Sequence, residues 1–149
     1  NIRSPYATRP WQHVLEPLSG YLCLAKQLYA DKKYHGEAYN FGPTAEQNYP
    51  VSELINEMSK TWNRAKWMDV SKNDNVHEAG LLKLNCDKAL YDLEWQSTLK
   101  FENTVKLTVD WYKRYYQNKN RSMHDFTIDQ IELYTRLAKS NDVSWADND

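Results

Sequence analysis

Glycine and cysteine are scarce in this 149-residue chain, and the sequence contains no long apolar run. Two cysteines, Cys23 and Cys86, are too few for a disulfide framework, which favours a reducing, cytoplasmic location. No apolar segment approaches the roughly 20 residues that cross a bilayer, so the sequence predicts no membrane partner. The net charge is only −1 and both signs are mixed along the chain, which argues against a nucleic-acid partner.

The scarcity of glycine bears directly on cofactor binding. A dinucleotide site of the usual kind needs a glycine-rich turn between a strand and a helix, and no such cluster exists among the four glycines. The four histidines are scattered at spacings that do not suit a metal site. Two Tyr-x-x-x-Lys spacings, Tyr29 with Lys33 and Tyr115 with Lys119, lie late on tyrosine- and lysine-rich helices, where chance explains them. We therefore expect no catalytic residue, no metal and no bound cofactor in this chain alone.

Aromatic residues, by contrast, are abundant, with six tryptophans and eleven tyrosines. This is more than a chain of this size needs for its core, so some of them are expected to cover a surface against which another segment packs. The chain begins at Asn1 without a methionine, and we expect it to be a piece of a longer protein. Its length suits one domain at 1–140, followed by a polar tail at 141–149 that is expected to fray.

Hydrophobic periodicity predicts helices and short strands in alternation, typical of an α/β or α+β piece. The expected helices cover 14–33, 51–62, 87–93 and 105–116, and a last helix begins with a capping box at Thr127. Pro17 fits the first turn of the first helix, and Asn85 is a candidate cap for the short one. Short strands are expected at 37–41, 66–70 and 81–84, with a β-like run before Pro17.

The stretch TRPWQHVLEPL, residues 8–18, contains the one local candidate for an anion site. Arg9 is followed by Pro10 and Trp11, which stiffen the turn between the β-like run and the helix. A guanidinium held in this way suits bidentate binding of phosphate oxygens. A surface salt bridge is the alternative, and the residues alone leave both interpretations open.

Four segments together resemble a known enzyme family. The stretches TRPWQHVLEPLSGYLCLAKQL, EAYNFGP, HEAGLLKLNCDKALYDLEWQ and TVKLTVDWY are similar to the C-terminal portion of the CDP-glucose 4,6-dehydratase family. That family belongs to the extended short-chain dehydrogenase/reductase superfamily. The resemblance implies an α/β fold in which this chain is the substrate-binding portion, mostly helical with a few short strands, and the N-terminal Rossmann half is absent.

The resemblance also implies a function. The family consists of lyases that convert CDP-D-glucose to CDP-4-keto-6-deoxyglucose, using NAD bound on the Rossmann half and a catalytic Tyr-x-x-x-Lys pair, in deoxysugar and O-antigen synthesis. This chain would then bind CDP-glucose but neither bind NAD nor turn over alone, and the full-length enzyme would be a homo-oligomer. Two alternatives stay open, namely the same region of another NAD-dependent nucleotide-sugar epimerase or reductase, and a non-catalytic interaction module.

Site residues follow from the resemblance by position. Arg9 matches the superfamily arginine that contacts the nucleotide diphosphate, and His77 and Glu78 fall where relatives place a second arginine and an acid against phosphate and ribose. Arg3 and Gln12 are further candidates for the same pocket. The resemblance further implies that the helix after Pro17 and the 37–41 segment pack against the Rossmann half, so both are expected to expose apolar surface.

Overall fold

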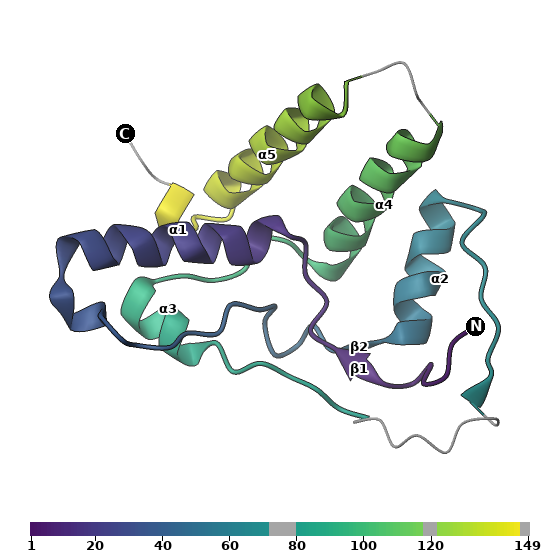
Figure 1. Ribbon diagram of the computed structural model, residues 1–149, viewed down its shortest axis with the longest axis horizontal. Coiled ribbons are helices and arrows are strands. Elements are labelled where there is room, and N and C mark those ends of the chain that lie inside the picture. The colour runs from purple at the N-terminus through teal and green to yellow at the C-terminus, as the bar shows by residue number, and fades with distance from the viewer. Residues whose placement is uncertain (72–79, 118–121, 147–149) are drawn as a thin grey trace.

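The computed structural model describes residues 1–71, 80–117 and 122–146, and within them the chain is mostly helical (Figure 1). The predicted helices are all present, although several begin or end elsewhere than expected. The elements in chain order are β1 (Thr8–Arg9), α1 (Leu15–Ala30), η1 (Lys32–Tyr34), β2 (Tyr49–Pro50), α2 (Val51–Thr61), α3 (Asp87–Leu93), α4 (Phe101–Gln117), α5 (Met123–Ser140) and η3 (Ser144–Ala146). The helical content and the two short strands are compatible with a fragment of an α/β protein.

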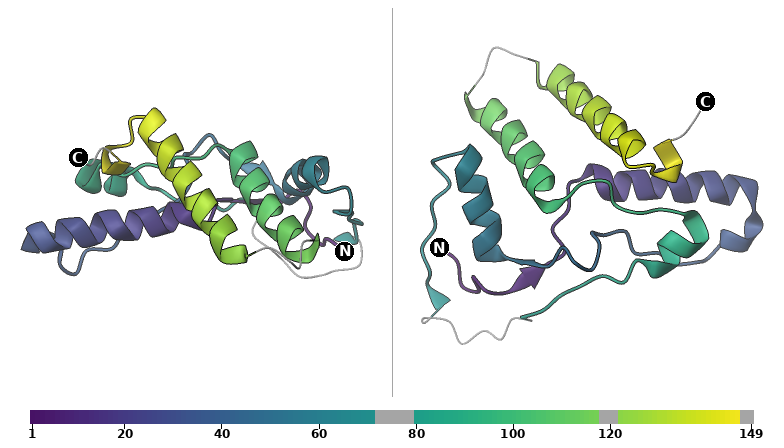
Figure 2. Two further views of the ribbon diagram at one scale, coloured as in Figure 1. Left: turned by 90° about the horizontal axis from the view of Figure 1, so that it is seen from above. Right: turned by 180° about the vertical axis from the view of Figure 1, so that it is seen from behind.

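Helix α4 is the central element of one half of the molecule, with α2 and α5 packed against it (Figure 1). Phe101, Val105 and Val109 recur every four residues along α4 and are buried, which gives the helix one continuous apolar face. Leu54 and Met58 of α2 pack against this face. The antiparallel pair of β1 and β2 lies near the same end of the molecule as α2, and the far end of α1 with η1 lies at the opposite end (Figure 2).

Helix α1 buries a narrow, partly polar face and turns most of its large apolar side chains outward. Its buried residues are Glu16, Ser19, Gly20 and Cys23, whereas most apolar residues that recur at helical spacing from Val14 to Tyr29 form a stripe that largely faces outward. The large exposed members of that stripe are Val14, Leu18, Tyr21, Leu22 and Tyr29. Polar groups can be buried here because each of the two polar side chains finds hydrogen-bond partners, as described below. The exposure of apolar surface expected for this helix is confirmed.

The three strands expected at 37–41, 66–70 and 81–84 are not formed. Backbone groups of a strand need a partner strand, and in the described part of the chain β1 and β2 pair only with each other. Near Asp69 there is a single parallel bridge to Ile2. The 37–41 segment is held in place by side-chain contacts instead of a strand ladder. Phe41 is buried, and Asn40 Nδ2 donates to the Asn85 carbonyl at 3.1 Å.

Two helix starts also differ from expectation. Helix α5 begins at Met123, where the Ser122 hydroxyl accepts from the Asp125 amide, so the capping box predicted at Thr127 is wrong. Thr127 lies inside the helix, and its hydroxyl donates to the Met123 carbonyl at 2.8 Å. Helix α4 begins at Phe101, four residues earlier than predicted. The Asn85 side chain accepts from the Asp87 amide at 3.0 Å, which supports the start of α3.

The segment expected to fray after residue 140 packs on the core as far as Ala146. Val143 and Ala146 are buried against Ala138 of α5, and the Trp145 ring stacks on Tyr134 at 5.6 Å. The apolar side chains of Val143 and Ala146 are enough to pack this otherwise polar segment against α5. Residues 147–149 lie outside the described part.

Candidate functional site

Arg9 lies on β1, which pairs antiparallel with β2 in the register Thr8 with Pro50 and Arg9 with Tyr49. Its side chain is half-buried, and Nη1 donates to the Thr8 carbonyl at 2.7 Å. The Tyr49 ring stacks on Phe101, the first residue of α4, with ring centroids 3.9 Å apart. The arginine is therefore carried by a backbone that is fixed against the central helix, not by a free loop.

The two residues after Pro10 are tied to different parts of the molecule. Trp11 Nε1 donates to the Tyr49 carbonyl at 2.8 Å, which anchors the tryptophan to β2. Gln12 Nε2 donates to the Phe41 carbonyl at 3.1 Å. Gln12 Oε1 is buried and has no hydrogen-bond partner among the described residues, so this oxygen is an unsatisfied acceptor.

Gln12 and His13 line a cavity of about 470 Å³ whose other walls are α4 and α5. His13 is buried, and its Nδ1 accepts from the Leu15 amide at 3.3 Å. Burial lowers the pKa of His13, so the ring is neutral at pH 7 and carries its proton on Nε2. Trp111 of α4 also lines the cavity, and its indole N–H donates to the Thr127 hydroxyl at 3.0 Å.

The remaining predicted site residues are placed only in part. Arg3 is exposed and follows Ile2, whose amide donates to the Met68 carbonyl at 2.8 Å. His77 and Glu78 lie outside the described residues. Gly80, where the description resumes, accepts from the Thr8 amide at 2.9 Å, so the chain returns there to the strand that carries Arg9.

Glu16, in the first turn of α1, is a site residue that sequence reasoning missed. Only 1% of it is exposed, yet it carries a carboxylate. Its oxygens accept from the amide of Thr98 at 3.0 and 3.1 Å, from the amide of Leu99 at 2.7 Å and from the Tyr134 hydroxyl at 2.9 Å. Burial raises the pKa of Glu16, and these three donors oppose that rise.

Ser19 extends this arrangement one turn further along α1. Its hydroxyl donates to the Glu16 carbonyl at 2.7 Å and accepts from Trp95 Nε1 at 2.9 Å. The Tyr134 oxygen lies 3.0 Å from Ser19 Oγ. Burial and the neighbouring carboxylate raise the pKa of Tyr134, so its hydroxyl remains a proton donor. We call Glu16, Ser19, Trp95 and Tyr134 the buried polar network.

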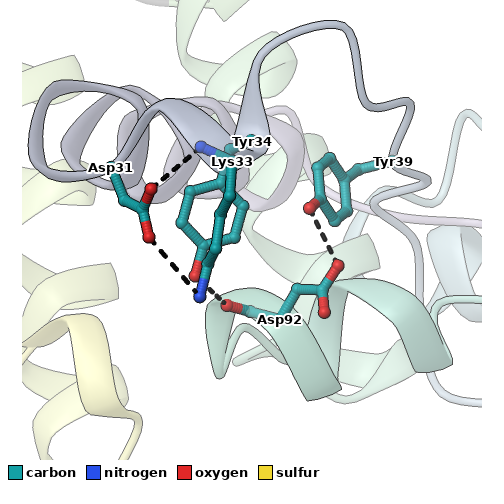
Figure 3. A network of polar contacts seen from close by, with 5 residues as sticks. All are labelled: Asp31, Lys33, Tyr34, Tyr39 and Asp92. Carbon is teal, nitrogen blue, oxygen red and sulfur yellow. Dashed lines mark hydrogen bonds and ion pairs between the residues drawn. The ribbon is translucent and has the colours of Figure 1, made fainter.

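A second polar network, nearer the surface, joins η1 and the 37–41 segment to α3 (Figure 3). Tyr34 donates to the Asp92 carbonyl at 3.1 Å, and Tyr39 donates to Asp92 Oδ2 at 2.9 Å. Asp31 accepts from the Lys33 amide at 2.9 Å, and Lys33 Nζ lies 4.7 Å from the centroid of the Tyr34 ring. Burial and the Asp92 carboxylate raise the pKa of Tyr39 to about 12, so this phenol stays protonated and its hydrogen bond ties the 37–41 segment to α3.

The described residues do not fit the NAD that the family resemblance implies. The segment between β1 and α1 contains no glycine, and Gly20 lies within α1, where an added Cβ would meet the Phe41 ring at 2.3 Å. Tyr29 is exposed at the end of α1, and its partner by spacing, Lys33, is engaged with Tyr34 and Asp31. Lys119 lies outside the described part.

Two further classes of site are not found in the described residues. No group of three or more potential metal ligands gathers among residues 1–71, 80–117 and 122–146. Over the same residues, every helix is too short or too polar to cross a bilayer.

The sequence of the chain is similar to that of a curated enzyme. No protein-family model matches the chain. The chain is 39% identical over 120 residues to the CDP-glucose 4,6-dehydratase of Salmonella typhimurium. The match includes 80% of this chain but only 33% of the relative, so the chain spans about one third of that enzyme's length. The resemblance to this dehydratase is thereby confirmed, and the share matched is consistent with a C-terminal portion of it.

Proposed function

We propose that this chain is the nucleotide-sugar-binding region of a CDP-D-glucose 4,6-dehydratase. The observation that supports this most is the 39% identity to the Salmonella enzyme, which extends over most of the chain. The whole enzyme would be an NAD-dependent lyase that converts CDP-glucose to CDP-4-keto-6-deoxyglucose for deoxysugar and O-antigen synthesis in the cytoplasm.

In this proposal Arg9 binds the diphosphate of CDP-glucose. A planar guanidinium can donate two parallel hydrogen bonds to phosphate oxygens, and the fixed backbone of β1 limits the entropy lost when it does so. Gln12 contributes its buried, unpaired Oε1 as an acceptor. Arg3, His77 and Glu78 are the other proposed contacts.

The rest of the enzyme would provide the NAD site and the catalytic tyrosine and lysine. The outward apolar face of α1 supports this division of labour, because exposed apolar patches of this kind mark surfaces that pack against another partner. We propose that a Rossmann half covers Leu18, Tyr21 and Leu22, that this chain does not turn over alone, and that the full-length enzyme is a homo-oligomer.

The test uses the longest reading frame that contains this sequence. The protein is incubated with CDP-glucose, UDP-glucose and dTDP-glucose, and 4-keto-6-deoxy sugars are detected by mass spectrometry. Product from CDP-glucose alone is expected. Product from UDP- or dTDP-glucose instead would favour another nucleotide-sugar enzyme of the superfamily, and no product from any of the three would refute the dehydratase proposal.

The phosphate contact is tested in the same protein with Arg9→Ala and the matched control Arg136→Ala. Arg136 is an exposed arginine of α5 that pairs with Glu132 at 3.7 Å, so its loss removes the same charge from a remote surface. For Arg9→Ala only, we expect KM for CDP-glucose to rise about tenfold or more, since the contact with the diphosphate is lost. A tenfold rise corresponds to about 1.4 kcal/mol of binding free energy. Equal values for the two variants would exclude Arg9 from substrate binding.

A further inference from the structure

The carboxylate of Glu16 is the buried charge that the proposed function leaves without a role. A carboxylate that is 1% exposed is expensive to desolvate, and a side chain that served only to fill space could be apolar. All three groups that contact its oxygens are donors, which matches an ionised carboxylate with no proton of its own to give. Two of these donors are backbone amides of residues that immediately precede α4.

The contacts of Glu16 close a ring that returns to Arg9. Leu99, whose amide donates to Glu16, uses its carbonyl to accept from Gln47 Nε2 at 3.3 Å. Two residues further on, Tyr49 pairs with Arg9 across the β1–β2 ladder and accepts from Trp11 Nε1. The chain from Arg9 to Glu16 is therefore held at one end by β2 and at the other end by the loop before α4.

This ring determines where the segment between β1 and α1 can lie. The segment begins with a tight turn, in which the Trp11 amide donates to the Arg9 carbonyl at 2.9 Å, and it ends where the Glu16 amide donates to the His13 carbonyl at 3.0 Å. A displacement of the first turn of α1 would pull on Gln12 and then on Arg9, because only a few covalently linked residues separate them. A displacement of this kind matters because binding groups must be held to within about 0.5 Å.

We infer that Glu16 is a positioning residue, whose carboxylate fixes the first turn of α1 against Thr98 and Leu99 and thereby sets the placement of Arg9 and Gln12. This inference rests on the proposed function in one respect, since the ligand that Arg9 and Gln12 are placed to receive is a nucleoside diphosphate. Glu16 itself touches no ligand.

The experiment compares Glu16→Gln with wild type and with the control Glu102→Gln in this 149-residue chain. The glutamine is nearly isosteric, but its amide group would present a donor to a second donor at Thr98 or Leu99. Glu102 lies in the first turn of α4 and is exposed. Its replacement therefore removes a negative charge from the N-terminal end of α4 without disturbing the Thr98 and Leu99 amides. Amide and indole N–H resonances are recorded by NMR, and CDP is titrated into each protein.

In Glu16→Gln we expect shifts at Thr98 and Leu99 and also at Arg9 and at the indole N–H of Trp11, with CDP binding weakened about tenfold. Glu102→Gln should leave Arg9, Trp11 and the CDP affinity unchanged. If Glu16→Gln shifts only Thr98 and Leu99 and binds CDP as wild type does, the positioning role is refuted even if the variant melts earlier.

Failure of the proposed function gives a different result. If wild type does not bind CDP at all, the nucleotide proposal for this chain fails, and the positioning role is then judged by the resonances alone. Shifts at Arg9 and Trp11 in Glu16→Gln, absent in Glu102→Gln, would support the role. Their absence would overturn it.

Discussion

Replacing Gly20 with alanine sets two known effects against each other. Gly20 lies within α1, where alanine is a better helix former by about 1 kcal/mol. An added Cβ, however, would meet three atoms of the Phe41 ring at 2.3, 2.5 and 2.7 Å, whereas carbon atoms in contact are ordinarily about 3.5–4.0 Å apart. The two effects therefore have opposite signs.

The structure indicates that the steric effect is larger. The Phe41 ring cannot move away freely, because it is buried and makes edge contacts with Trp95 at 5.0 Å and with Tyr21 at 5.7 Å. Overpacking of a filled core costs about 1–3 kcal/mol, and a displacement of more than 1 Å places this site at the upper end of that range. After the gain in helix propensity, we expect a net loss of about 2 kcal/mol, or about 4–8 °C in Tm.

The assay is urea unfolding followed by circular dichroism, with Gly80→Ala as the control. An added Cβ at Gly80 would meet no atom of the described residues within 4 Å. A double variant with Phe41→Leu should recover part of the loss, since a smaller side chain leaves room for the new methyl group. If Gly20→Ala is as stable as wild type or more stable, the steric reasoning is refuted.

Three further predictions concern the buried polar network and α1. Tyr134→Phe should lower the free energy of unfolding by about 1.5–3 kcal/mol, because it removes a hydrogen bond to a charged group, whereas Tyr91→Phe at an exposed site should not; equal effects in urea unfolding would contradict this. Burial raises the pKa of Glu16 above 4.5, so the folded protein takes up this proton more readily than the unfolded chain, and this contribution to stability is lost as the pH rises through the folded-state value. The stability of wild type relative to Glu16→Gln should therefore decline from pH 4.5 upward in urea titrations, and a constant or rising difference would disprove the shift. Leu18 and Leu22 are 45% and 73% exposed, so we expect the chain to associate through this face in sedimentation velocity. Changing both to glutamate should reduce that association without lowering Tm, and unchanged association would refute the role of this face.

Periodicity located the helices but not their orientation. The helix predicted at 87–93 has these bounds in the structure, and the one predicted at 51–62 is observed at Val51–Thr61. For α1, predicted at 14–33 and observed at Leu15–Ala30, the family resemblance gave the exposed apolar face, whereas periodicity alone cannot say which surface a helix turns toward the rest of the chain. The three missing strands failed for a related reason, because a strand depends on a partner that the local sequence does not specify.

Some residues of the candidate site could be predicted from the sequence and others could not. Arg9 and Gln12 could be proposed from a single stretch, and the structure describes both on one anchored segment. Glu16 could not be found in this manner, because an acidic residue in the first turn of a helix is ordinary. Its partners lie 82, 83 and 118 positions further along the chain, so only the folded structure brings them together.

That separation has a consequence for the order of events during synthesis. Helix α1 leaves the ribosome long before Tyr134 exists, and at about 5–20 residues per second the delay over 118 positions is about 6–24 s. Until Thr98 and Leu99 are made, 82 and 83 positions after Glu16, the carboxylate has none of these donors and remains hydrated, and its set of donors is complete only with Tyr134. The nascent chain must carry an amphipathic helix with an unsatisfied apolar face for this whole period, which makes it a natural client for a chaperone that binds such faces.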